Sequence, residues 1–253
     1  MPGMIRNELE FYQLTSIGDR GVNQDCMAHK IECDYSFFVV ADGLGGHHAG
    51  EKASLFFCQG LYRQAPKYQQ LVLKAPDKAK EILAAWVSAA IDDMEKLFSG
   101  DVKATDSHTT CVVLYLDDNI AATIHCGDSR IYRLNEKQVL WRTKDHSLIQ
   151  KQLDDGTITE REMGLHPEQN QLTRSITIQK KFKPDINIYP PIQKGETFLL
   201  CTDGFWEFIK EKDLLQLAAY GSDLNELKKM AKMMHFRAQG KSDNLTVQWV
   251  RCC

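Results

Sequence analysis

The chain has 253 residues, of which 43% are hydrophobic and 26% charged, and its formal net charge is -3 at pH 7. These fractions are ordinary for a soluble globular protein, and the slight negative charge excludes a basic field for non-specific nucleic-acid binding. The longest apolar stretches fall far short of the ~18 residues that a membrane helix needs, and the N-terminus lacks the apolar core of a secretory signal. We therefore expect one domain over residues 1–253, in the cytoplasm, with no membrane or nucleic-acid partner and with a monomer as its working state.

The eight cysteines are scattered along the chain without a C-x-x-C pair, and several lie inside apolar runs. Such cysteines are typical of small buried hydrophobic side chains in a reducing compartment. The cysteine pattern gives no reason to expect a zinc site.

The first predicted element is a β-strand over 11–17, which is rich in aromatic and β-branched residues. A polar, turn-rich segment follows over 18–25, where Arg20 and Asp25 bracket a loop.

A run of phenylalanines and valines over 37–40 predicts a buried strand that ends at Asp42. The glycine-rich loop 43–46 permits positive φ and close backbone approach, and 50–64 has helix-forming character. The unit is therefore strand, glycine loop and helix.

Such a unit could bind a dinucleotide, but two residues argue against that alternative. His48 stands where the last glycine of G-x-G-x-x-G belongs, and the carboxylate of Asp42 would repel a pyrophosphate while attracting a cation. The loop favours a metal ion over a phosphate. Taken alone, however, an Asp-Gly pair is also compatible with a simple turn.

A second helix is expected over 77–98, with apolar residues at three- and four-residue spacing. Three strands follow over 110–116, 120–126 and 130–134, and the links between them are so short that we expect antiparallel pairing. The polar region 145–176 is either a substrate-side insertion or a plain surface excursion.

The C-terminal part begins with a buried strand over 197–201 that leads into Asp203-Gly204 and so repeats the layout around Asp42. A helix over 224–235 and a last strand over 245–250 follow, and Asp243 precedes that strand. Helices in groups beside antiparallel strands indicate an α+β fold.

Asp42, Asp203 and Asp243 each lie at the edge of an apolar strand, so an antiparallel sheet could bring them together at one end. Clustered carboxylates repel one another and suit a hard divalent ion such as Mg²⁺ or Mn²⁺. Arg20 adds a forked donor that fits a phosphate.

These motifs resemble the PPM, or type 2C, metal-dependent Ser/Thr protein phosphatases in their compact bacterial form. Blocks in the family's order extend over nearly the whole chain: Arg20-x-x-Asn23-Gln24-Asp25, Val40 to His47 with Ala49-Gly50-Glu51, Thr109-Thr110, Gly127-Asp128-Ser129-Arg130, Leu172-Thr173-Arg174, Thr202-Asp203-Gly204 and Asp243-Asn244. The resemblance implies an α-β-β-α sandwich of two antiparallel sheets between helix layers, with a flap-like segment over about 145–180.

The resemblance also assigns roles to single residues. Asp42 would bridge two Mn²⁺ or Mg²⁺ ions, with the Gly43 carbonyl on one ion and Asp203 and Asp243 on the other. The remaining assignments are these: Asp25 acts on the metals through water, Arg20 binds the phosphate, and Asp128 helps to bind a third, weaker metal ion or is a satisfied turn aspartate.

Two departures from the family pattern stand at Leu44 and His108, and two histidines follow the glycine loop. Leu44 stands where some members carry a histidine as a candidate general acid, and His47 and His48 are interpreted as structural. His108 replaces the glycine that usually precedes Thr109, which puts the local backbone geometry there in question.

The implied activity is hydrolysis of phosphoserine and phosphothreonine in proteins by a water that bridges the two metals, with an opposing Ser/Thr kinase as an expected partner. The alternative is a catalytically silent phosphatase-like module that binds phosphoproteins.

Overall fold

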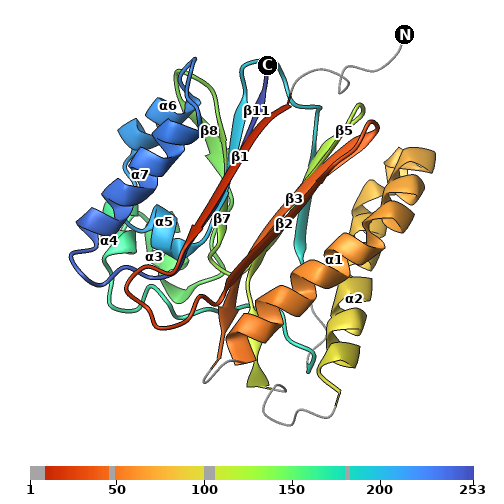
Figure 1. Cartoon of the computed structure of the whole chain (residues 1–253), viewed down its shortest axis with the longest axis horizontal. Coiled ribbons are helices and arrows are strands. Elements are labelled where there is room, and N and C mark those ends of the chain that lie inside the picture. Colours follow the sequence, from red (N-terminus) through yellow and green to blue (C-terminus); the bar gives the residue numbers. More distant parts are fainter. Residues whose placement is uncertain (1–8, 46–48, 100–105, 180–182) are drawn as a thin grey trace.

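The computed structural model of the chain describes residues 9–45, 49–99, 106–179 and 183–253. Two antiparallel β-sheets lie face to face between two layers of helices (Figure 1). This arrangement confirms the predicted α+β class and the α-β-β-α sandwich.

The first sheet carries both chain ends of the described structure and has the strand order β1-β11-β10-β7-β8. Its strands are β1 (Leu9–Ser16), β7 (Arg130–Leu134), β8 (Val139–Arg142), β10 (Thr197–Cys201) and β11 (Leu245–Cys252). Because β11 pairs with β1 over its whole length and with β10 on its other side, the last strand of the chain lies inside the sheet.

The second sheet has the order β2-β3-β5-β6-β9, and the short strand β4 pairs with β3 beyond β5. Its strands are β2 (Asp25–Ile31), β3 (Tyr35–Leu44), β4 (His108–Thr109), β5 (Cys111–Asp117), β6 (Ala121–Cys126) and β9 (Asp185–Tyr189). β3 and β5 are buried along most of their length, as expected of central strands covered on both faces.

Helices cover the outer face of each sheet (Figure 1). α1 (Ala49–Lys74) and α2 (Ala79–Leu97), joined by the 3₁₀ turn η2 (Pro76–Lys78), lie on the second sheet. α5 (Asp203–Trp206), α6 (Glu211–Ala218) and α7 (Leu224–Arg237) lie on the first, while α3 (Leu148–Asp154) and α4 (Glu160–Gly164) belong to the flap-like segment.

Three apolar clusters hold these layers together. One cluster joins the helices α1 and α2 to the second sheet around Trp86 and Phe37. Another joins the helices α5, α6 and α7 to the first sheet around Trp249. The third lies between the sheets and includes Phe38 and Phe198, both fully buried. Alternate residues of β3 therefore serve two different cores, as the two-residue period of a strand requires.

Most predicted elements are present, but strands β2, β4, β8 and β9 and the short helices α3, α4, α5 and α6 were not predicted. β2 and β9 carry lysine, histidine, aspartate and asparagine and are only partly buried, because both are edge strands of the second sheet. Their strand state depends on pairing with β3 and β6, which local composition does not report.

Helix α1 extends to Lys74, well beyond the predicted end at residue 64. Pro66 lies inside the helix and cannot donate a backbone hydrogen bond, which is why the pattern suggested an end there. The second half of the helix is retained because Tyr68 and Val72 are buried in the core below it.

The expectation of antiparallel pairing was right for β5 and β6 but wrong for β6 and β7. β6 pairs with β5 and β9 in the second sheet, whereas β7 pairs with β10 and β8 in the first. The turn between them contains Gly127 at φ +97° and passes the chain from one sheet to the other. This crossing places the next residue, Asp128, at the end of the sandwich.

Four of the cysteines, Cys58, Cys111, Cys126 and Cys201, are buried and free, as their apolar surroundings predicted. None of the helices in the described ranges is long and apolar enough to cross a membrane.

A test of the helix packing is Gly60→Ala. A Cβ at residue 60 would lie 2.7 Å from the Ala90 carbonyl oxygen and 2.9 Å from its Cα, so α1 and α2 would have to separate. We expect a loss of about 1–3 kcal/mol in the free energy of unfolding, despite alanine's better helix propensity. Urea denaturation measures this change, with the exposed neighbour variant Gln59→Ala as the control; equal stabilities for the two variants would contradict the packing argument.

Candidate active site

Asp42 lies near the end of β3, directly opposite Asp25 in the paired strand β2. Its backbone is fixed on the other side, where its N–H donates to Thr110 Oγ1 at 2.9 Å. Its carbonyl oxygen accepts from the Thr110 N–H at 2.8 Å and from Thr109 Oγ1 at 2.9 Å. The strand end is therefore held by hydrogen bonds that leave the Asp42 carboxyl group uncommitted.

Gly43 is required by close backbone packing. A Cβ at this position would lie 2.0 Å from the Gly50 carbonyl oxygen, in the first turn of α1. The Gly43 N–H donates to the Gln24 carbonyl at 3.1 Å, which ties this strand end to the loop before β2. The glycine thus lets strand, helix and loop meet within backbone contact distance.

Asp203 and Asp243 come from the first sheet, where Asp203 follows β10 and Asp243 precedes the neighbouring strand β11. The Thr202 N–H donates to the Thr246 carbonyl at 3.0 Å, and the Thr246 N–H donates to Thr202 Oγ1 at 3.0 Å. A Cβ on Gly204 would lie 2.2 Å from the Asn244 carbonyl oxygen. These contacts bring the two aspartate-bearing segments together.

Asn244 links the first sheet to the loop that carries Arg20. Its Oδ1 accepts from the Gln24 N–H at 2.8 Å, and its Nδ2 donates to the carbonyls of Ile17 and Val22 at 2.9 and 3.0 Å. One amide side chain thus positions three points of the loop.

Asp128 joins the group from the turn that crosses between the sheets. Its carbonyl accepts from Trp206 Nε1 at 2.9 Å, and the next residue, Ser129, shares a hydroxyl hydrogen bond of 2.7 Å with Thr110. The sequence left open whether Asp128 is a satisfied turn aspartate, but its carboxyl is buried among other carboxyl groups.

The five predicted aspartates repel one another strongly. Burial, followed by the charge of Asp203, raises the pKa of Asp42 well above its usual range, and burial followed by Asp128 does the same for Asp203. Burial also raises the pKa values of Asp25 and Asp128 to about 7. In ionised form this group would be unstable without a cation.

The environment of Asp25 shows that the cluster has room for a positive charge. Its Oδ2 accepts from Thr202 Oγ1 at 2.9 Å, but within the described ranges its buried Oδ1 has no hydrogen-bond donor. This side chain meets the Asp42 carboxyl, and the two can share a hydrogen bond only while one of them is protonated. A divalent cation with oxygen ligands fits the position of that proton.

Arg20 lies at the solvent side of the cluster. Its Nη2 donates to Asp243 Oδ2 at 2.6 Å, and 57% of its side chain is exposed. Asp243 raises the pKa of Arg20, and the charges of Asp203 and Asp42 add to this effect. The guanidinium of Arg20 therefore lies close to the aspartate cluster and is still accessible to a ligand.

Sequence reasoning missed several residues that support this site. The hydroxyls of Thr202 and Thr246 and the indole of Trp206 hold the aspartates in place without being ligands themselves. The available signal was position alone, since Thr202 directly precedes Asp203 and Trp206 lies three residues after it.

Two of the three expectations on histidines fall outside the described structure, since His47 and His48 belong to the undescribed segment 46–48. His108 is described, and it pairs with Leu44 across β4 and β3. Its Nδ1 shares a hydrogen bond of 2.9 Å with Ser175 Oγ. The histidine in place of glycine therefore leaves the contacts of Thr109 and Thr110 with Asp42 intact.

The flap-like segment is anchored to the Asp128 turn by a buried ion pair. Arg130 donates to both carboxylate oxygens of Asp145, at 2.9 and 2.7 Å, and its guanidinium stacks on the Trp206 ring at 3.4 Å. Burial opposes the Arg130 charge, but the Asp145 carboxylate keeps its pKa above the ordinary value.

A second potential metal site is formed by His125, His146 and Asp185, whose ligand atoms lie within 4.8 Å of one another. Arg174 Nη1 already donates to Asp185 at 2.9 Å, and it lies 3.4 Å from His146 Nε2. His146 Nδ1 accepts from the Gly127 N–H, so Nε2 carries the proton and donates to Asp185. The Arg174 guanidinium therefore already supplies a positive charge beside Asp185, and His146 fixes Gly127 by accepting a hydrogen bond from its N–H.

Comparison with known proteins gives a consistent assignment. The family model described as protein phosphatase 2C matches residues 15–239. The chain is 28% identical over 245 residues to protein phosphatase PhpP of Streptococcus pneumoniae, covering 96% of this chain and 97% of that protein. It is 30% identical over 213 residues to the serine/threonine phosphatase stp of Listeria monocytogenes, covering 83% of this chain and 81% of the relative.

Solved structures show the same fold. The serine/threonine phosphatase PstP/Ppp of Mycobacterium tuberculosis superimposes with a TM-score of 0.80 at 24% identity, covering 96% of this chain and 98% of that one. A PstP catalytic domain in complex with two manganese ions gives a TM-score of 0.75 at 23% identity, over 96% and 97% of the two chains.

The carboxylate repulsion predicts a pH effect on the metal-free protein. Asp25 and Asp128 hold protons up to about pH 7 when folded but release them near pH 4 when unfolded, so lowering the pH through 7 should favour the folded state. We expect the Tm in chelator to rise between about pH 8 and about pH 6.5, and to rise less in Asp128→Asn. Buried His125 opposes the trend at lower pH equally in both proteins, so identical slopes would contradict the prediction.

The buried ion pair predicts a large loss of stability in Asp145→Asn. This variant leaves Arg130 buried with only the more distant Glu160, at 3.5 Å, and should lose about 3 kcal/mol in the free energy of unfolding. Asp154→Asn, which breaks the exposed pair with Lys144, should cost less than about 1 kcal/mol. Comparable losses in the two variants would show that the buried pair is not an anchor.

Proposed function

The chain belongs to the protein phosphatase 2C family, and on that premise we propose that it hydrolyses phosphoserine and phosphothreonine in proteins at the carboxylate cluster. The observation that carries this proposal is the convergence of five aspartates from both sheets and the turn between them. Burial and neighbouring carboxylates raise the pKa values of Asp42 and Asp203, and among the described residues Asp25 Oδ1 has no hydrogen-bond donor. Relatives that are 28% and 30% identical to this chain bear the names of a protein phosphatase and a serine/threonine phosphatase, which agrees with this chemistry.

The residues present fit two divalent cations. In our proposal Asp42 would contribute to both ions, the Gly43 carbonyl to one of them, and Asp203 and Asp243 to the other; Asp128 would contribute to a third. Mn²⁺ or Mg²⁺ suits such an all-oxygen ligand set, and the related PstP domain was solved with two manganese ions. When bound, these ions neutralise the carboxylates, lower the pKa of a water and polarise the phosphate oxygens.

The chain's own residues supply orientation and proton acceptance. Asp25 is held by Thr202 through one oxygen, so its other oxygen can accept a hydrogen bond from the attacking water. Arg20 can turn from Asp243 to the phosphate and hold two of its oxygens with its forked donors. The water gives up a proton to the free oxygen of Asp25 as its oxygen bonds to phosphorus and the bond from phosphorus to the serine or threonine oxygen breaks. The departing oxygen takes a proton from solvent, so the products are the alcohol and inorganic phosphate, and no covalent phosphoenzyme forms.

We further propose that residues 1–253 work as one phosphatase domain and that 145–180 forms a flap over the substrate. The apolar cluster between the sheets and the ion pair of Arg130 with Asp145 support this unity. An opposing Ser/Thr kinase, a cytoplasmic location and a monomeric state complete the proposal, and the buried free cysteines are compatible with a reducing compartment.

The test is Mn²⁺-dependent hydrolysis of a phosphothreonine peptide. We expect activity that disappears in chelator. In Asp42→Asn and Asp203→Asn, kcat/KM should fall on the order of 100-fold, because each variant removes a carboxylate from the cluster. Asp34→Asn, an exposed change at the far end of β3, should match the unaltered protein.

Two results would count against the proposal. Full activity in chelator or in both site variants would exclude the metal mechanism. Tight peptide binding without turnover in saturating Mn²⁺ would instead support a catalytically silent binding module.

A further inference from the structure

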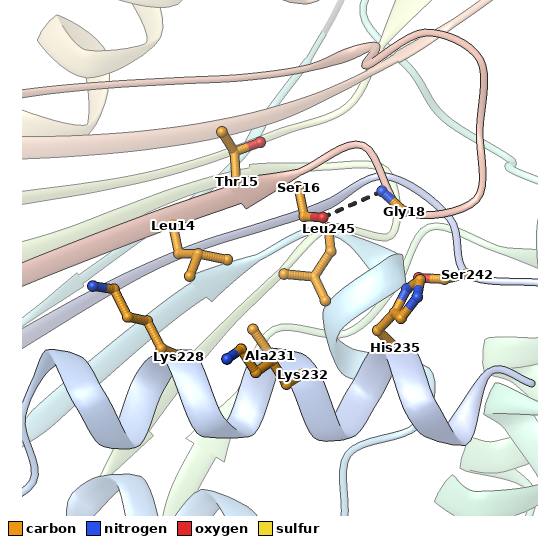
Figure 2. A pocket seen from close by; sticks show the side chains of 10 residues that line it. All are labelled: Leu14, Thr15, Ser16, Gly18, Lys228, Ala231, Lys232, His235, Ser242 and Leu245. Atoms are coloured by element: carbon orange, nitrogen blue, oxygen red, sulfur yellow. Dashed lines mark hydrogen bonds between the residues drawn. The ribbon is translucent and has the colours of Figure 1, made fainter. Parts of the chain in front are cut away.

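A cleft of about 520 Å³ is lined by residues of β1 and α7 (Figure 2). Its lining residue Ser242 directly precedes Asp243, but none of the five site aspartates lines it. Lys228, Lys232 and His235 line it from α7, and Ser16 and Ser242 line it from the opposite side. Figure 2 shows the three basic residues following one another along the helix towards Ser242. No aspartate or glutamate is among the described residues that line the cleft.

The cleft shares a wall with the active site. The Asp19 N–H donates to the Ser242 carbonyl at 3.0 Å, and the Ser242 N–H donates to Asp19 Oδ2 at 2.8 Å. Arg20 follows Asp19 in one loop and Asp243 follows Ser242 in the other. These two residues form the ion pair on the solvent side of the site. A peptide whose phosphorylated residue reaches Arg20 can therefore continue into the cleft.

The two lysines are available for a ligand. Both are exposed, and neither has a carboxylate within ion-pair distance among the residues that the structure describes. Lys229, the next residue on the same helix, differs because it pairs with Glu226 at 3.5 Å. His235 Nε2 lies 4.0 Å from Asp19 Oδ1. Asp19 lies at the His235 end of the cleft, so the charges of the two lysines remain without an acidic partner among the described residues and favour an anionic occupant.

The spacing of the lysines selects the form of that occupant. Four residues of helix rise about 6 Å, and alternate side chains on one face of an extended peptide are separated by about 7 Å. Acidic residues at positions i and i+2 of a peptide would therefore each meet one lysine. The hydroxyls of Ser16 and Ser242 lie across the cleft from them.

We propose that this cleft binds a pair of acidic side chains, two residues apart, on one side of the phosphorylated residue of the substrate protein. The inference rests on the proposed phosphatase function and adds a preference for acidic flanking sequences to it.

The test compares phosphothreonine peptides that carry a Glu-x-Glu or a Gln-x-Gln pair, placed at several distances on either side of the phosphothreonine. We expect the Glu peptide to have a kcat/KM about 5- to 10-fold higher on one side only, mainly through KM, and the preference to shrink at high salt. Lys228→Gln/Lys232→Gln should abolish the preference, whereas Lys229→Gln should keep it.

Charge reversal provides the second measurement. Lys228→Glu/Lys232→Glu should favour Lys-x-Lys over Glu-x-Glu peptides, while hydrolysis of p-nitrophenyl phosphate, which does not extend into the cleft, should be unchanged. Equal rates for Glu and Gln peptides with an active enzyme, or a preference that survives both double variants, would overturn the cleft assignment alone. Failure to hydrolyse any phosphopeptide in Mn²⁺ would overturn the proposed function and this inference with it.

Discussion

Mutual repulsion among buried carboxylates is the constraint on which the rest of this structure depends. Asp42 and Asp203 are held at positions where ionisation is unfavourable, and their pKa values rise because burial and like charges act together. The fold tolerates this arrangement because backbone hydrogen bonds and close glycine contacts fix the strand ends independently of the carboxyl groups. Such a cluster suits a metal-dependent protein phosphatase, because the repulsion among the carboxylates that destabilises the metal-free site also favours cation binding.

Small polar side chains between the sheets transmit this organisation. Thr202, which directly follows β10 of the first sheet, donates to Asp25 of the second. Thr110, which directly precedes β5 of the second sheet, shares a hydrogen bond with Ser129 at the crossing turn. Asn244 extends the network to the Arg20 loop. Each of these groups is satisfied by a partner on another element, so the network specifies how the elements meet as well as stabilising them.

Strand-edge position was enough to predict Asp42, Asp203 and Asp243 as one group, because buried apolar runs mark central strands and the residues after them lie at sheet ends. Asp25 was placed in a loop, and only its pairing with β3 makes it the first residue of a strand. The role of the Gly127 turn as a crossing between sheets was also hidden, because a short link ordinarily makes a hairpin. Local patterns thus identified aspartates that converge at one end of the sandwich, while long-range pairing decided which sheet carries each one.

The crossing turn has a consequence for how the two sheets may move. Asp25 and Asp42 ride on one sheet and Asp203 and Asp243 on the other, with Asp128 on the connection between them. A slip of one sheet over the other by a single residue would separate these groups by about 3 Å while leaving each sheet's own hydrogen bonds unbroken. Phe38 from the second sheet and Phe198 and Val250 from the first are buried in one apolar cluster between the sheets, and a slip would disrupt its packing. The apolar layer between the sheets therefore determines how the aspartates of the two sheets are positioned relative to one another, although it lies in a core away from the carboxylates.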